Sequence, residues 1–393
     1  MSIRKNEAVW IENRQLWRIN VQSEGERRSF YDPTPGKKGK VLCEQKADKW
    51  LEEKLVNENT RTEVLLDRWY KKLQLSTSLS NCIQYEKYIR LYITPVMGLK
   101  RISRINQSDL QSVIDNAYAL PDSVKHPRKK KKDPKESPSD EEITPKKLAY
   151  KTLCNIRACL MAFIKYCRDI KATTMHPETL TIPAAAEKHE KTIAEPDDIV
   201  KLFTVSTTLY RNKRIEDRYI HAYRFCVLTG VRPGELIALK SDNIQDKRVK
   251  ITQSINNYKQ TTKGKNDNAR RTYSLDDHAL RVLAEQSEML KLLSQISPYV
   301  FPSKTLGPMT QERFRKSWKQ YCKSNGISGA NTPYELRHTF VSVNTDMPEA
   351  LKKLVIGHSK GMDTEGIYGH EKADDMEKAA EHISAAFRKI LGW

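Results

Sequence analysis

Residues 332–370 bring together side chains that could hold a phosphodiester and attack it. Arg337 offers a planar fork of N–H donors, which suits phosphate oxygens. Tyr334 and His358 add neutral hydrogen-bond donors, and Tyr368 carries a phenol that can act as a nucleophile. This set permits attack on phosphorus with formation of a covalent tyrosyl intermediate.

A second arginine, Arg232, lies about a hundred residues upstream in the run Thr229-Gly230-Val231-Arg232-Pro233-Gly234-Glu235-Leu236. Gly230 is a natural residue to end a helix, and Pro233 is a natural residue to begin the next one. An arginine held between them has little freedom, which suits a phosphate clamp. Glu235 follows one helical turn later and could orient Arg232.

The charge of the chain favours a polyanionic partner. Its 393 residues carry a formal net charge of +20, with a pI near 9.5. Such a field attracts nucleic acid, and the excess is spread over the whole length, as an extended contact with double-stranded DNA requires. The length predicts two or three domains.

The same composition argues against several other classes. No apolar run is long enough to span a membrane, and the N-terminus lacks the apolar segment of a signal peptide. Seven scattered cysteines without a Cys-x-x-Cys pair favour neither zinc nor a disulfide framework. We therefore expect a reduced, cytoplasmic protein, associated with the nucleoid of a bacterium, with no cofactor and no metal.

Three regions are predicted, giving a multidomain, mainly α protein with small β elements. Residues 1–57 predict strands over 10–22 and 27–31, a basic turn over 32–40 and a helix over 43–56, that is, a small three-stranded sheet on one helix. Residues 58–187 predict a helical bundle, with helices over 63–73, 80–93 (ended by Pro95 and Gly98), 106–117 and 147–168. Within it, the charged insertion 121–146 has almost no apolar residue, so we expect a mobile loop.

Residues 188–393 are predicted to be an α+β domain that positions the site. We expect helices from Glu195, over 218–229, over 310–323 and over 372–393, and a short strand over 299–301. Strands over 248–256 and 271–275 flank a Lys-rich segment, which predicts a hairpin carrying Lys263 and Lys265. The last helix could pack on its own domain or on a neighbouring copy.

These motifs resemble those of the tyrosine recombinases of the phage and conjugative-transposon integrase type. The resemblance rests on the Arg232 run, on Thr262-Lys263-Gly264-Lys265, on Tyr334-Glu335-Leu336-Arg337-His338, on Leu354-Val355-Ile356-Gly357-His358 and on Ile367-Tyr368-Gly369-His370. It implies an arm-type DNA-binding domain (1–57), a core-binding domain (58–187) and a catalytic domain (188–393). It also implies a homo-tetramer on DNA, with an excisionase and a host DNA-bending protein as possible partners.

The resemblance further implies a role for each site residue. Arg232 and Arg337 would hold the scissile phosphate, Lys263 (or Lys265) would protonate the leaving 5′-oxygen, and Tyr368 would form a 3′-phosphotyrosine. The integrase would thereby integrate and excise a mobile element without ATP or metal. The family has histidine where this chain has Tyr334, and a phenol with an unperturbed pKa of about 10 does not titrate near neutrality. We therefore expect Tyr334 to position the phosphate rather than to act as a base.

Two other functions use the same residues. A type IB topoisomerase-like enzyme would relax DNA with this catalytic set, although it would not need the small N-terminal module. A DNA-binding regulator that has lost catalysis would keep the basic surfaces but not the full polar set. Covalent capture of a nicked duplex separates the recombinase from the regulator, and relaxation of a plasmid without a specific site separates it from the topoisomerase.

Overall fold

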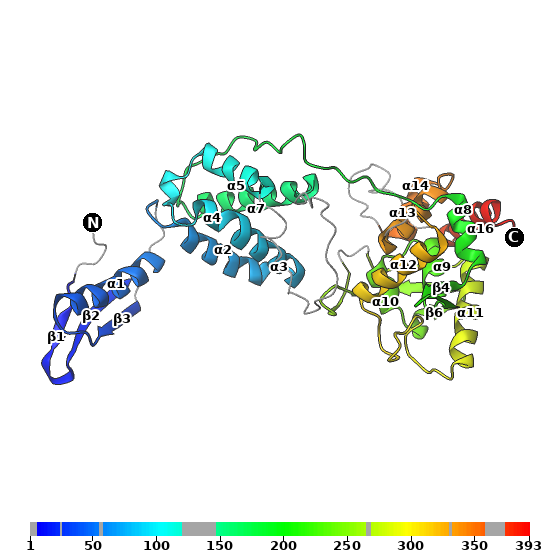
Figure 1. Ribbon diagram of the computed structural model, residues 1–393, viewed down its shortest axis with the longest axis horizontal. Coiled ribbons are helices and arrows are strands. Elements are labelled where there is room, and N and C mark those ends of the chain that lie inside the picture. The colour runs from blue at the N-terminus through cyan, green and yellow to red at the C-terminus, as the bar shows by residue number, and fades with distance from the viewer. Residues whose placement is uncertain are drawn as a thin grey trace. The chain divides into compact units, whose positions relative to one another are not determined.

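The computed structural model describes residues 6–23, 26–54, 58–119, 147–264, 269–329, 332–357 and 374–393. The chain divides into two compact units, residues 1–189 and residues 190–393 (Figure 1). Within the first unit, the N-terminal sheet and the helical bundle have separate hydrophobic clusters. The assignment of DNA-binding roles to these parts stays a prediction.

The N-terminal part is a three-stranded antiparallel sheet covered by one helix, as the sequence predicts. The sheet has the order β1-β2-β3. Its elements are β1 (Val9–Ile11), η1 (Glu12–Arg14), β2 (Leu16–Ser23), β3 (Glu26–Asp32) and α1 (Gly36–Lys54). Ile19 and Val21 from β2 pack against Cys43, Ala47 and Trp50 from α1, which gives this part its own small core.

Two predictions for this part were wrong in detail. A single strand over 10–22 does not form, because η1 and the left-handed Gln15 (φ +50°) turn the chain back on itself. The helix begins at Gly36 rather than at Cys43, since the lysines that were taken for a turn are good helix formers and Pro35 precedes them.

The helical part of the first unit contains the four predicted helical segments. They are α2 (Thr62–Ser76), α3 (Leu79–Tyr88) with its continuation, α5 (Gln107–Ala119) and α7 (Tyr150–Asp169). Leu65, Leu110, Ile156 and Phe163 are fully buried between them. The predicted loop 121–146 lies outside the described residues.

The second predicted helix ends at Gly98, one of the two residues predicted to stop it, and not at Pro95. After α3 the chain continues through a π-helical turn, η2 (Ile89–Ile93), into α4 (Thr94–Met97). Pro95 occupies the first turn of α4, where an N–H group has no helical partner to lose. A short 3₁₀ turn, η3 (Ile102–Arg104), then leads to α5.

The second unit is built around the buried helix α9. Nine of its ten residues are buried, and it packs against α11 and α13. The described elements of this unit, in chain order, are α8 (Pro196–Thr204), β4 (Thr207–Tyr210), β5 (Lys213–Glu216), α9 (Ile220–Thr229), α10 (Pro233–Ala238), η4 (Ser241–Asn243), β6 (Ile244–Gln245), β7 (Arg248–Ile251), β8 (Ser254–Ile255), β9 (Thr261–Thr262), β10 (Arg271–Ser274), α11 (Asp277–Leu292), α12 (Gln311–Asn325), α13 (Pro333–Val343), α14 (Glu349–Ile356) and α16 (Asp375–Leu391).

The predicted hairpin is present but consists of two ladders. β7 pairs with β10 (Ile251 opposite Arg271), and β8 pairs with β9 (Ser254 opposite Thr262). The unbroken strand over 248–256 was therefore wrong, because the chain leaves the first ladder after Ile251 and enters the second at Ser254. The strand over 299–301 is reduced to one bridge between Tyr299 and Lys240.

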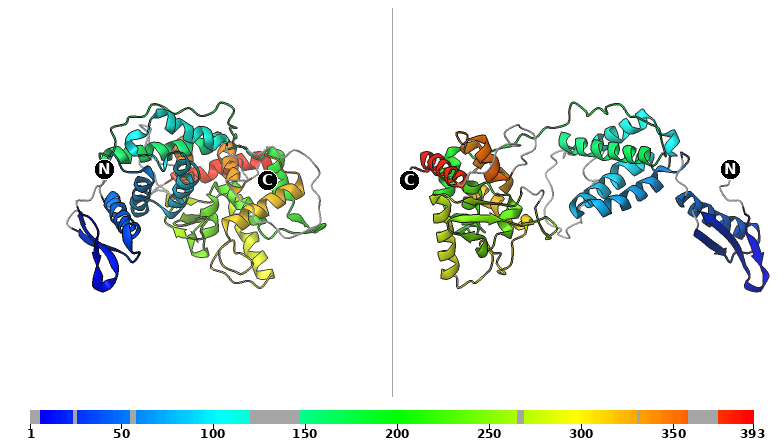
Figure 2. Two further views of the ribbon diagram at one scale, coloured as in Figure 1. Left: turned by 60° about the vertical axis from the view of Figure 1, so that its left-hand side comes forward. Right: turned by 180° about the vertical axis from the view of Figure 1, so that it is seen from behind.

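The C-terminal helix α16 packs on its own unit. Ala379, Ile383 and Phe387 enter the main core, and α16 contacts α8, α11, α14 and β10 (Figure 2). Arg248 and Glu377 add an ion pair between β7 and α16 (2.5 Å). No helix among the described residues is long and apolar enough to cross a membrane.

Candidate active site

Arg232 is held where one helix ends and the next begins. α9 ends at Gly230, whose positive φ of 62° turns the chain, and Arg232 precedes the first residue of α10. Its backbone N–H donates to Glu235 Oε2 (3.0 Å), and its Nη1 donates to Glu235 Oε1 (2.8 Å). Glu235 therefore caps α10 and aims the guanidinium at the same time.

Glu235 also holds a second arginine that the sequence analysis did not select. Arg271, the first residue of β10, donates from Nη2 to Glu235 Oε2 (2.9 Å). The carboxylate is only 2% exposed. Burial by itself would raise the pKa of Glu235, but attraction to Arg271 and Arg232, with their hydrogen bonds, outweighs it and lowers the pKa.

Arg337 lies one turn inside α13 and is buried. The N–H of Thr332, before the helix, donates to the Glu335 carboxylate (2.5 Å), which caps the first turn. Arg337 donates from Nη1 to Gly230 O (2.7 Å) and from Nη2 to Ile356 O (2.7 Å). Its side chain thus links the end of α9 to the end of α14.

Three arginines converge on the C-terminal end of α14. Arg271 Nε donates to Val355 O (2.6 Å), Arg337 Nη2 to Ile356 O (2.7 Å) and Arg232 Nη2 to Gly357 O (3.1 Å). The last carbonyls of a helix have no partner within it and lie at its negative end, so cations are favoured there. These bonds join α9, α10, β10 and α13 to the backbone that leads directly to His358.

The convergence leaves an electropositive site. Burial, with repulsion from Arg232 and Arg271, lowers the pKa of Arg337, although Glu235 opposes this effect. Arg232 and Arg337 each use two of their five N–H donors in the bonds described above. The remaining donors and the unneutralised charge suit an anion with several oxygens, such as a phosphodiester.

An open pocket of about 560 Å³ borders Arg232. Tyr334 lines this pocket, and the residue is 46% exposed. The Tyr334 ring meets the ring of His338, one helical turn later, edge-on at 5.2 Å. The other lining residues come from α10, β8, the β8–β9 turn, α12 and the start of α13: Pro233, Gly234, Ser254, Asn257, Gln311, Glu312, Arg315, Thr332 and Pro333.

Part of the second unit is similar to known proteins. Residues 193–374 match the family described as the phage integrase family. The C-terminal unit thus carries a domain that matches the phage integrase family. The integrase of Staphylococcus phage L54a is 28% identical over 177 residues, which are 40% of this chain and 49% of that protein. An integrase of Streptomyces ambofaciens is 27% identical over 197 residues (44% and 50%). The chain therefore spans about half the length of these two integrases.

Solved integrase structures share the fold. The integrase of the Tn1549 transposon, in complex with transposon right end DNA, matches with a TM-score of 0.58 and 16% identity, over 81% of this chain and 98% of that one. A lambda integrase tetramer bound to a Holliday junction matches with a TM-score of 0.54 and 16% identity, over 93% and 96%. The predicted fold class, a multidomain, mainly α protein with small β elements, is confirmed.

The structure describes some of the predicted site residues and not others. It brings Arg232, Glu235 and Arg337 together, and it puts Tyr334 beside Arg232 in the same pocket. Lys263 directly follows β9 and is exposed, and no bond joins it to an arginine of the site within the part of the chain that is described. His358, Tyr368 and Lys265 lie outside the described residues, so their roles stay predictions.

The β8–β9 hairpin that precedes Lys263 is nevertheless anchored at the site. A Cβ on Gly234 of α10 would meet Ser254 Oγ at 2.5 Å and Ile255 O at 2.8 Å, so only glycine allows this approach. Gln311 Nε2 of α12 donates to the same Ile255 carbonyl (2.5 Å). The base of the hairpin is therefore fixed against α10, the helix that begins directly after Arg232.

Two residues near this site, Arg271 and His338, were not among the predicted site residues. Arg271 appeared only as the residue that opens the strand after the Lys-rich segment, and nothing local distinguishes it from exposed Arg270. His338 follows Arg337 directly and was quoted only as part of a motif. Burial, with repulsion from Lys191 and Arg337, lowers the pKa of His338, so it is a neutral imidazole at neutral pH.

Proposed function

We propose that this chain is a site-specific DNA recombinase, an integrase that integrates and excises a mobile genetic element. It would cut and rejoin DNA strands through a transient 3′-phosphotyrosine. The observation that carries this proposal is the three-arginine cluster at the end of α14, in a unit that matches the phage integrase family. The positive charge of the cluster favours an anion. The chain that the cluster holds at Gly357 continues directly into the segment that contains His358 and Tyr368.

Arg232 and Arg337 would stabilise the charge that develops on the phosphate. Their free N–H groups bind the two non-bridging oxygens, and a preorganised donor of this kind contributes about 10²–10³ to the rate. Glu235 and Arg271 do not touch the phosphate. They fix the Arg232 guanidinium, so that little reorganisation is needed as the transition state forms.

The covalent step then balances without metal or ATP. The Tyr368 oxygen gives its proton to solvent water and forms a bond to phosphorus, while the bond from phosphorus to the 5′-oxygen breaks. Lys263 supplies the proton that the leaving 5′-oxygen takes up, and Lys265 is the alternative donor. The lysine that protonates the 5′-oxygen recovers a proton from solvent, so no net proton is gained or lost. Tyr334 and His358 donate hydrogen bonds to the phosphate. Attack by a 5′-hydroxyl of another strand reverses the step and restores the tyrosine.

The partners of this reaction follow from the same proposal. The relatives' structures contain transposon end DNA in one case and a Holliday junction held by a tetramer in another. We propose double-stranded core sites, a homo-tetramer on DNA, and arm-type sites for residues 1–57. An excisionase and a host DNA-bending protein would set the direction, in the cytoplasm of a bacterium.

Covalent capture on a nicked core-site duplex tests the proposal. The wild-type chain should become covalently joined to the DNA, because the short fragment beyond the nick diffuses away and prevents religation. Tyr368→Phe should bind the duplex with unchanged affinity and trap none. Tyr210→Phe, which changes an exposed tyrosine of β4, is the matched control and should trap as well as the wild type.

Three outcomes would contradict the proposal. Trapping by Tyr368→Phe would show that another residue is the nucleophile. Absence of trapping by the wild type on any end of its element would favour a DNA-binding regulator. Relaxation of plasmids that lack a core site, at the same rate as plasmids that contain one, would favour the topoisomerase.

A further inference from the structure

The segment that opens the second unit is bonded to α13, the helix that carries one of the two arginines of the candidate site. Thr192 Oγ1 donates to Glu335 Oε1 (2.9 Å), and the N–H of Ala194 donates to Thr339 Oγ1 (2.9 Å). These bonds join residues that are 143 and 145 positions apart in the chain. We call residues 192–194 the strap.

The strap is held closely by its neighbours. Thr339 is completely buried, and its hydroxyl also donates to Glu335 O (2.9 Å), so the acceptor of the Ala194 N–H is fixed in orientation. A Cβ on Gly329, which lies in the chain that leads to α13, would overlap the carbonyl group of Ile193, so only glycine allows this approach. The strap therefore has little freedom to leave α13.

The bond from Thr192 falls on the carboxylate that caps α13. Glu335 is the third residue of the helix, and its Oε2 accepts from the N–H of Thr332, the residue before the helix (2.5 Å). Its Oε1 accepts from the hydroxyl of Thr192. A carboxylate held at both oxygens cannot rotate away from the cap, so the first turn of α13 is protected from fraying.

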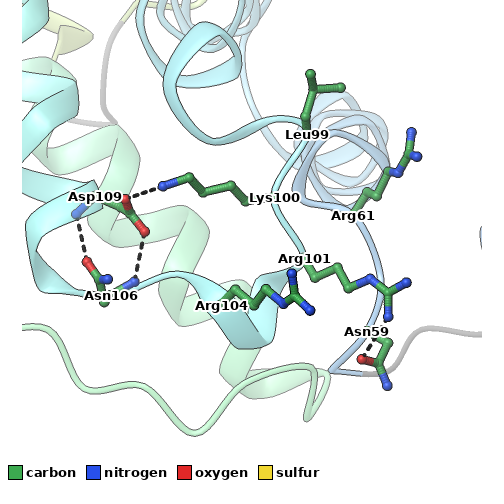
Figure 3. Close-up of a pocket in the computed structure, with 8 residues that line it drawn as sticks. All are labelled: Asn59, Arg61, Leu99, Lys100, Arg101, Arg104, Asn106 and Asp109. Carbon is green, nitrogen blue, oxygen red and sulfur yellow. Dashed lines mark hydrogen bonds and ion pairs between the residues drawn. The ribbon is translucent and has the colours of Figure 1, made fainter.

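The start of α5 shows how a cap of this form is held without a distant segment (Figure 3). There, Asp109 Oδ2 accepts from the N–H of Asn106, the residue before the helix (3.2 Å), and Asp109 Oδ1 pairs with Lys100 (2.5 Å). Lys100 lies nine positions from Asp109, so this cap is completed within one short stretch of chain. The cap of α13 has the same form, but the partner of its second oxygen comes from the strap.

The turn that this cap holds forms part of the candidate active site. Thr332, Pro333 and Tyr334 line the pocket that borders Arg232. Arg337 follows on the same helix, where its guanidinium binds two backbone carbonyls. A change in the direction of the first turn would move Tyr334 relative to both arginines. A small displacement of a positioned group is enough to slow a reaction strongly.

We propose that Thr192 is a positioning residue for the cleavage of the DNA strand. It holds Glu335, and through Glu335 it fixes the first turn of α13, with Tyr334 directed at the scissile phosphate. Thr192 acts through this turn and not on the phosphate itself. The inference rests on the proposed function, because it assigns Thr192 a part in that reaction. It makes the strap, which belongs to none of the sequence motifs, a component of the site.

The rate of covalent capture on the nicked core-site duplex, measured with the full chain at saturating DNA, tests this role. Thr192→Val keeps the shape of the side chain and removes the donor. It should capture DNA about five- to tenfold more slowly than the wild type, because one hydrogen bond to a charged group is lost. Its affinity for DNA should stay within about twofold, since no DNA contact changes. Thr192→Ser restores the hydroxyl and should restore most of the rate.

Two controls separate positioning from a general loss of stability. Thr204→Val removes another exposed threonine hydroxyl of the second unit, which donates to Val200 O (2.9 Å), and should capture DNA at the wild-type rate. Hydrogen exchange of the full chain should be faster in the first turn of α13 for Thr192→Val, while peptides from α9 keep their wild-type protection.

The titration of His338 reports on the strap without any cleavage. Burial is the main cause of the lowered pKa of His338, followed by repulsion from Lys191 and Arg337, and Glu335 opposes them. Lys191 directly precedes Thr192, so release of the strap takes this cation away from the imidazole. The pKa of His338 should therefore rise in Thr192→Val, as it should in Lys191→Gln. Histidine resonances, assigned with His338→Gln, measure this change.

Several results would overturn the proposal. Capture at the wild-type rate by Thr192→Val would do so, as would slow capture by Thr192→Ser, because the hydroxyl would then not be the cause. A fall in DNA affinity that matches the fall in rate would make Thr192 a binding residue instead. A wild type that captures no DNA would contradict the proposed function and with it the role in cleavage, and the titration of His338 would still show whether the strap holds α13.

Discussion

Arg271→Met should destabilise the second unit more than any change on its surface. Arg271 donates to Val355 O (2.6 Å), Ala269 O (3.0 Å) and Glu235 Oε2 (2.9 Å), and its side chain is 6% exposed. Methionine keeps much of the volume but removes every donor. Removing one partner of a buried ion pair costs about 3–5 kcal/mol, because the other charge is left buried and poorly compensated.

The loss of unfolding free energy in Arg271→Met should be larger at neutral pH than at acidic pH. In the wild type the pKa of Glu235 is lowered from its ordinary value of 4.5, so its stabilising contribution is present above pH 4.5 and is lost as the pH falls through the folded-state pKa. In Arg271→Met, burial is opposed only by Arg232, so the pKa rises and Glu235 takes up a proton more readily. The difference in unfolding free energy between wild type and variant should therefore be largest at pH 7 and should shrink below about pH 4.5.

Urea unfolding combined with hydrogen exchange measures this difference. Exchange is followed in peptides from α9 and α10, which report on the second unit alone. Arg270→Met is the matched control, since it removes the same charge from the exposed neighbour and should cost less than about 0.5 kcal/mol. In Arg271→Met/Glu235→Gln the buried charge is gone, so the pH dependence should disappear.

Either of two results would contradict the prediction for Arg271→Met. A loss below about 1 kcal/mol at pH 7 would mean that the three hydrogen bonds of Arg271, to Val355, Ala269 and Glu235, contribute little to the stability of the unit. A loss of the same size at pH 7 and at pH 4 would mean that Glu235 is not the group whose charge Arg271 compensates.

The remaining predictions concern the same site. Gly230→Ala should cost at least about 1–2 kcal/mol in thermal or urea unfolding, because residue 230 has φ +62° and its Cβ would meet the Phe340 ring at 2.5 Å; an unchanged midpoint would contradict this. Arg232→Lys should lower the cleavage rate on a nicked duplex by about 100-fold or more while DNA affinity stays nearly the same, and an equal loss in both would make Arg232 a binding residue only. Tyr334→Phe should keep the ring contact with His338 and slow cleavage about tenfold through loss of one hydrogen bond, whereas a normal rate would remove Tyr334 from the site.

Much of the local structure can be predicted from the sequence, because it depends on interactions between residues that lie close together in the chain. The apolar periodicity of residues 147–168 predicts α7, and the run from Thr229 to Glu235 predicts a helix end, a clamped arginine and a carboxylate that orients it, all of which the structure contains. Where local signals were ambiguous, the predictions failed: the lysines of residues 37–40 form part of a helix, and Pro95 lies inside one.

The sequence by itself determined which residues could do chemistry, and the tertiary structure decided which of them meet. The pairing of Arg271 with Glu235 spans 36 positions, and the bond from Arg232 to Gly357 spans 125, so no periodicity or motif encodes either one. They arise because packing of α9 against α13 and of β10 against α14 brings three guanidinium groups to the unpaired carbonyls at one helix end. Residue type and spacing are local properties, whereas the meeting of charge with an unsatisfied backbone depends on how the whole core packs.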